Sequence, residues 1–146
     1  MKATGILTSP NHPGNYPHNL DKTETLVVES GKVLRLEFTY FAVYAGNITT
    51  CPYDFVKITD GNGTTLMDKT CGFDFGFGSD YFQPEPITTW TNRVEIFFHT
   101  DVGCTTSGWS LSWSAVTPGE KALVLNSVRI VHTFTTNSNF DIFIET

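Results

Sequence analysis

Hydrophobic and polar residues alternate along several short stretches of the chain, each bounded by glycine, asparagine, aspartate or proline. The clearest is residues 108–116, where Trp109, Leu111, Trp113 and Ala115 alternate with serines. A period of two places alternate side chains on opposite faces of a β-strand. No window carries a helical stripe over three turns, so the pattern predicts an all-β, antiparallel sandwich or barrel. The other predicted strands lie within residues 24–30, 32–43, 54–61, 64–70 and 93–101.

Three segments depart from this alternation. Residues 9–19 contain three prolines, and residues 71–86 are rich in glycine and phenylalanine, so both are expected to be loops. After a break at Pro118 and Gly119, the chain alternates again like two more strands around a turn at 135–139. We therefore divide the chain into a domain at 1–118 and a segment at 119–146 that forms additional strands or begins a following unit.

Composition and charge exclude several classes of function. The chain has 146 residues, the size of one ordinary domain, and 9 basic against 15 acidic residues give a net charge of −6. An acidic chain without a basic patch is not expected to bind nucleic acid. No apolar run is long enough to span a bilayer, and the first residues lack the apolar core of a signal peptide, so an export signal would lie outside this chain.

Several motifs resemble those of the CUB domain, an extracellular module. They are SPNHPGNYP at 9–17, CPYDFVKITDG at 51–61, CG at 71–72, FHTD at 98–101 and GW at 108–109. The similarity covers roughly residues 5–116, in order and at the spacing of the family. It implies a jelly-roll-like sandwich of two antiparallel sheets in a secreted protein or in the ectodomain of a membrane protein.

The resemblance also implies a disulfide between Cys51 and Cys71. Such a bridge would close a loop of about twenty residues, stabilise the fold by roughly 3 kcal/mol and require an oxidising compartment. Lys22 stands where many CUB domains have a further cysteine, so we expect a short or missing N-terminal edge strand. Cys104 has no family partner, which leaves two interpretations: pairing with a second copy to form a dimer, or a half-buried unreacted thiol.

Two glycosylation sequons are consistent with export. They are Asn47-Ile-Thr and Asn62-Gly-Thr, both in predicted loops. For Asn62 the alternative is a purely structural role in an Asn-Gly hairpin turn.

The resemblance also implies a candidate cation site built from acidic residues at one end of the sandwich. Calcium-binding CUB domains supply a glutamate and two aspartates, and the aspartates correspond to Asp54 and Asp101. Tyr44 stands in place of the glutamate, and a neutral phenol is a poor ligand for Ca²⁺. We therefore expect weak Ca²⁺ binding or none, with the Tyr44 hydroxyl bonded to one of the two carboxylates. The alternative is that Asp54 caps a turn.

Catalysis is not expected. The four histidines are scattered without zinc-ligand spacing, and no glycine-rich phosphate loop precedes a helix. Two kinds of binding remain open, besides a scaffold role in a larger secreted protein. One is capture of a Lys or Arg of an extracellular protein by Tyr44, Asp54 and Asp101. The other is glycan binding by aromatic side chains whose alternative use is core packing: Phe73, Phe75, Phe77, Tyr81 and Phe82.

Overall fold

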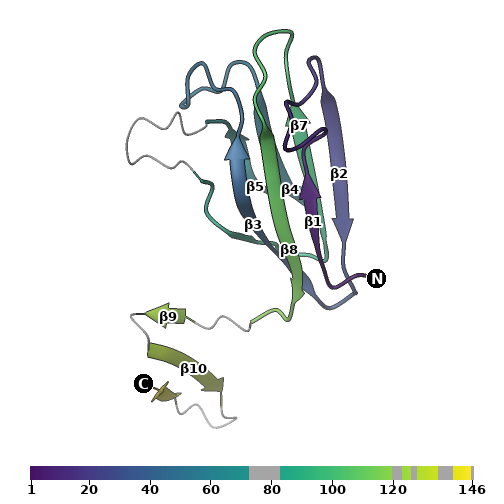
Figure 1. Ribbon diagram of the computed structural model, residues 1–146. Coiled ribbons are helices and arrows are strands. Elements are labelled where there is room, and N and C mark those ends of the chain that lie inside the picture. Colours follow the sequence, from purple (N-terminus) through teal and green to yellow (C-terminus); the bar gives the residue numbers. More distant parts are fainter. Residues whose placement is uncertain (73–82, 120–122, 126–127, 135–139, 146) are drawn as a thin grey trace.

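Two antiparallel four-stranded sheets pack face to face into a β-sandwich, as the sequence predicts (Figure 1). The structure is a computed structural model that describes residues 1–72, 83–119, 123–125, 128–134 and 140–145. The first sheet has the order β1-β8-β3-β6, with β1 (Thr4–Thr8), β3 (Val33–Ala42), β6 (Ile87–Thr88) and β8 (Gly108–Val116). The second has the order β2-β7-β4-β5, with β2 (Asp21–Val27), β4 (Phe55–Asp60), β5 (Thr65–Thr70) and β7 (Arg93–His99).

The alternating residues form the core between the two sheets. The Trp109 side chain lies at its centre, with ring centroids 6.0 Å from Phe38 and 5.9 Å from Phe98, both in edge-to-face arrangements. Such aromatic pairs contribute about 0.5–1.5 kcal/mol beyond their buried area. Fully buried aliphatic residues of β3, β4, β7 and β8 fill the rest of the core: Leu34, Val56, Ile58, Val94, Ile96 and Leu111.

The N-terminal edge strand is present and short. β1 has five residues and pairs with β8 from Thr4↔Ser114 to Thr8↔Ser110. At Gly5 a Cβ atom would lie 2.7 Å from the indole of Trp113, so only glycine lets the edge strand approach this closely. The proline-rich loop that follows is ordered by backbone hydrogen bonds to the 106–109 region, including Ser9 N to Trp109 O and Tyr16 N to Thr106 O.

Residues after the sandwich form a separate sheet of three antiparallel strands, two of which the sequence predicts. They are β9 (Leu123–Leu125), β10 (Val128–Phe134) and β11 (Phe140–Glu145), in the order β11-β10-β9. Within the described parts of the chain, their ladders join only one another. The division of the chain at residue 118 stays a prediction. No helix in the described ranges is long and apolar enough to cross a membrane.

Strand β4 separates the two ends of the sandwich, each of which has a buried aspartate. We call the loops 9–20, 43–54 and 100–107 the Asp54 end, where Asn19 N donates to Asp101 O. We call the turns 28–32 and 61–64 and the loop 89–92 the Asp60 end, where Val28 N donates to Asn92 O. Asp54 immediately precedes β4, and Asp60 is its last residue.

Candidate functional site

Asp54 is the centre of a hydrogen-bond network at its end of the sandwich. Its side chain has no exposed surface, and its Oδ1 accepts a hydrogen bond from the backbone N–H of Asp101 at 2.9 Å. Its Oδ2 accepts one from the Tyr16 hydroxyl at 2.6 Å. Burial raises the pKa of the Asp54 carboxyl above its usual range, and the nearby Asp101 charge acts in the same direction, although the two hydrogen bonds oppose the shift.

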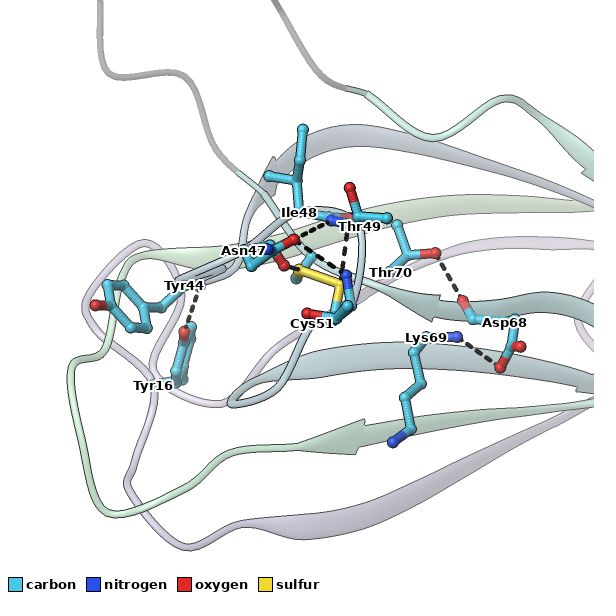
Figure 2. The surroundings of a disulfide bond; sticks show 11 residues. Tyr16, Tyr44, Asn47, Ile48, Thr49, Cys51, Asp68, Lys69 and Thr70 are labelled. Carbon is cyan, nitrogen blue, oxygen red and sulfur yellow. Dashed lines mark hydrogen bonds between the residues drawn. A yellow bond between two sulfur atoms is a disulfide. The ribbon is translucent and has the colours of Figure 1, made fainter.

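Tyr16 is the member of this network that sequence reasoning missed. Its side chain is 2% exposed, and its hydroxyl accepts a hydrogen bond from the Tyr44 backbone N–H at 2.9 Å (Figure 2). It also accepts one from Thr106 Oγ1 at 3.4 Å. Burial, followed by the hydrogen bond to Asp54, raises the pKa of the phenol, which therefore stays a donor. A tyrosine inside a loop with three prolines is a signal that could have identified it, because such a loop needs an internal anchor.

The predicted hydrogen bond from the Tyr44 hydroxyl to Asp54 or Asp101 is not formed. The phenol that reaches Asp54 belongs to Tyr16, because the Tyr44 backbone, and not its hydroxyl, joins the network. The Tyr44 hydroxyl lies instead beside the thiol of Cys104, which raises the pKa of the phenol. Cys104 is exposed and has no disulfide partner within this chain, so the interpretation as a half-buried thiol is wrong; its pairing with a second copy stays a prediction.

Asp101 presents the accessible carboxylate of this end. Its side chain is half-buried, and its Oδ1 accepts a hydrogen bond from the Gly103 backbone N–H at 2.8 Å. The Asp101 backbone N–H donates to Asp54 Oδ1, and the Asp101 carbonyl accepts a hydrogen bond from the Asn19 N–H. The backbone of Asp101 is therefore fixed on both sides. Direct contact of a partner with Asp54, in contrast, is inconsistent with the complete burial of that residue.

A disulfide between Cys51 and Cys71 closes the loop beside this network (Figure 2). The loop is further held by a two-way backbone bridge between Val43 and Gly72, with N–O distances of 2.9 and 2.8 Å. At Gly46 the backbone has a φ of +60°, and a Cβ atom would lie 2.3 Å from the Tyr53 ring. Glycine is therefore required there, both for the backbone conformation and for the close approach of the ring.

Three exposed apolar or aromatic side chains lie in the loops of the Asp54 end. Val102 is 78% exposed, Ile48 is 67% exposed and Tyr53 is 43% exposed. The Tyr53 ring lies 5.9 Å from that of Tyr44. An end of the sandwich that offers both a partly exposed acid and exposed apolar groups suits a Lys or Arg side chain, which has both a charged head and an apolar stem.

The fit of this end to Ca²⁺ is partial. Ca²⁺ takes six to eight oxygen ligands, usually with several carboxylates. Asp54 and Asp101 are the two carboxylates present, and no group of three or more His, Cys, Asp or Glu side chains able to hold a metal occurs among the described residues. Tyr44 adds no charge. The described donor set therefore falls short of the six to eight oxygen ligands that Ca²⁺ takes.

The remaining predicted site residues lie elsewhere or outside the described residues. Asn47 and Asn62 are both exposed, and the Oδ1 of each accepts a hydrogen bond from the backbone N–H of its sequon threonine, at 2.8 and 2.9 Å. Asn47 is at the Asp54 end, whereas Asn62 is at the Asp60 end. The candidate glycan-binding aromatics fall in residues that the structure does not describe: Phe73, Phe75, Phe77, Tyr81 and Phe82.

Comparison with known proteins places the sandwich in a family. Mannan-binding lectin serine protease 1 of Mus musculus is 34% identical over 113 residues, covering 77% of this chain and 15% of that protein. Cubilin of Rattus norvegicus is 30% identical over 114 residues, covering 78% of this chain and 3% of that protein. The chain thus spans a small fraction of the length of these curated relatives.

Solved structures give the same result. The MASP-1 CUB2 domain bound to Ca²⁺ matches with a TM-score of 0.67 and 30% identity, covering 78% of this chain and 94% of that one. The CUB1-EGF-CUB2 domain of human MASP-1/3 matches with a TM-score of 0.68 and 34% identity, covering 79% of this chain and 40% of that one. The family profile of the CUB domain matches residues 1–113. This chain belongs to the CUB domain family.

Proposed function

We propose that this chain is a non-catalytic extracellular module that captures a basic side chain of a partner protein at Asp101. CUB domains are interaction modules of extracellular proteins and are typically non-catalytic. The observation that carries the specific mode is the partly exposed Asp101 carboxylate, whose backbone and Oδ1 are held by hydrogen bonds. Exposed apolar residues occur in the loops of the same end. A fixed acceptor loses little conformational freedom when a partner binds.

Asp54 acts in this proposal through Asp101 rather than on the partner. Its Oδ1 accepts a hydrogen bond from the Asp101 backbone N–H at 2.9 Å, and its Oδ2 accepts one from the Tyr16 hydroxyl at 2.6 Å. Asp54 is therefore a positioning residue. Its negative charge adds to the field that attracts a cation, because a buried charge is screened by solvent less than an exposed one.

Calcium is secondary in the proposed mode. The solved MASP-1 CUB2 domain is bound to Ca²⁺. Among the described residues this end offers two carboxylates, so we expect Ca²⁺ to bind no more tightly than about 10⁻³ M, at the weak end of the range for extracellular modules. Calorimetric titration of the chelator-treated protein measures this affinity. Tyr44→Glu adds the third carboxylate and is expected to tighten Ca²⁺ binding by about tenfold or more.

The main test is binding to immobilised poly-L-lysine with and without a calcium chelator. Asp101→Asn keeps an oxygen acceptor for the Gly103 N–H and removes the charge, and we expect it to weaken binding about threefold to tenfold. Glu29→Gln makes the same change in net charge on an exposed residue at the Asp60 end and serves as the matched control. Equal weakening by the two variants would show that only net charge matters, and would refute capture at Asp101.

A further inference from the structure

Trp90 is an exposed aromatic side chain on a rigidly held loop. Its side chain is 73% exposed, whereas Trp109 and Trp113, the other two tryptophans of the chain, are 1% and 9% exposed. The backbone of the loop is fixed, because Trp90 N donates to Asp60 Oδ1 at 2.8 Å. The buried Thr89 hydroxyl, beside it, donates to Thr91 O at 2.7 Å. An indole displayed on such a backbone is preorganised for contact.

The Asp60 carboxylate that holds Trp90 also holds Asn62, the first residue of a glycosylation sequon. The Asn62 backbone N–H donates to Asp60 Oδ2 at 3.0 Å, so the two oxygens of one side chain hold Asn62 and Trp90. The intervening turn also packs on the loop: Gly61 N donates to Arg93 O at 2.9 Å, and a Cβ atom at Gly61 would lie 2.7 Å from Thr91 Oγ1. The turn and the loop therefore form one unit.

Asn62 is in a suitable state for modification. It is exposed, and its side-chain Oδ1 accepts a hydrogen bond from the Thr64 N–H at 2.9 Å. Its Nδ2 makes no hydrogen bond among those described for the residues around it. Because that nitrogen is the atom that carries an N-linked sugar, a glycan could be attached without breaking a contact of the fold.

We propose that Asn62 carries an N-linked glycan whose first sugars pack on the indole of Trp90. In the attachment step, Nδ2 bonds to C1 of N-acetylglucosamine from a lipid-diphosphate-linked oligosaccharide. The bond from C1 to the phosphate oxygen breaks, the lipid diphosphate leaves, and Nδ2 loses one proton. The apolar face of the sugar then covers the aromatic ring, which removes apolar surface of both from water. The glycan shields the Asp60 end and leaves the Asp54 end accessible.

The test uses the chain secreted from mammalian cells that make high-mannose glycans. Glycopeptide mass mapping locates the sugar, and endoglycosidase H leaves one N-acetylglucosamine on the asparagine. Thr64→Ala abolishes the sequon but keeps the backbone N–H that bonds Asn62 Oδ1. Acrylamide quenching of tryptophan fluorescence reports mainly on Trp90, since the other two indoles are buried.

We expect a glycan on Asn62 and a quenching constant about half that of Thr64→Ala, before and after trimming to one sugar. Thr49→Ala, which removes only the sequon at the other end, serves as the control and leaves the quenching unchanged. The glycan is also expected to raise the melting temperature by about 3 °C when Trp90 is present and not in Trp90→Ser. An unmodified Asn62 in the secreted protein, or equal quenching with and without the glycan, would overturn the proposal. Neither result depends on Asp101, so this inference and the proposed function fail independently.

Discussion

Each end of strand β4 has a buried aspartate, and the pKa values of the two carboxyls are shifted in opposite directions. Asp54 and Asp60 are 0% and 2% exposed, so neither side chain has appreciable solvent-accessible surface. Burial raises the pKa of Asp54, and its two hydrogen bonds do not compensate. At Asp60 burial acts in the same direction, but hydrogen bonds from three backbone amides outweigh it and lower the pKa. The difference lies in the number of fixed donors around each carboxylate.

This contrast separates a structural end from a candidate functional end. Asp60 joins the turn 61–64 to the loop 89–92, and its charge is fully used in that role. At Asp54 burial disfavours the ionised form, and under the proposed function a cation or a basic side chain near Asp101 would favour it. Buried carboxyls with raised pKa values are enriched at functional sites for this reason. Three predictions test the comparison.

Asp60→Ala should have the largest effect on stability. It removes the acceptor of the backbone N–H groups of Asn62, Trp90 and Thr91, and we expect the free energy of unfolding to fall by about 3 kcal/mol. Urea denaturation monitored by circular dichroism measures this change. Asp60→Asn keeps one acceptor oxygen and is expected to lose about half as much. A loss below about 1 kcal/mol for Asp60→Ala would show that water replaces the carboxylate at this end.

Tyr16→Phe should destabilise the protein less, by about 2 kcal/mol. It removes the donor to Asp54 Oδ2 and the acceptor of the Tyr44 N–H, while the aromatic ring still fills its place beside Phe98. The same denaturation experiment measures the change. Tyr53→Phe, at a half-exposed tyrosine of the same end, is the control and should lie within about 0.5 kcal/mol of the wild type. Equal effects of the two substitutions would contradict the central position of Tyr16.

The sequence predicts the sheets better than the two carboxylate networks. Alternation in residues such as Trp109 and Leu111 identifies core strands because period and burial are local properties of a strand. The donors to Asp60 include amides thirty positions later in the chain, so the sequence around it shows only a hairpin turn. The sequence likewise predicts a bond from Tyr44 to one of the two carboxylates, Asp54 or Asp101, whereas the fold brings Tyr16, thirty-eight positions away, to Asp54.

The pH dependence of stability should distinguish the two aspartates by sign. Asp60 has a lowered pKa, so it stabilises the folded state above the unfolded value of about 3.9, and this stabilisation is lost as the pH falls through the folded value. Asp54 has a raised pKa, so its protonated form favours folding, and that contribution is lost as the pH rises through its folded value, above about 3.9.

Substituting either aspartate by asparagine removes its pH-dependent contribution to the free energy of unfolding. Subtracting the pH profile of Asp60→Asn from that of the wild type should give a difference that changes only below about pH 4, with the wild type losing its advantage on acidification. The corresponding difference for Asp54→Asn should change above about pH 4 and in the opposite direction, because the wild type then carries a buried charge. Urea denaturation between about pH 2 and pH 7 measures both profiles. Two differences of the same sign would mean that both ends hold their carboxylates in the same way, and the assignment of the Asp54 end as the binding end would lose its electrostatic basis.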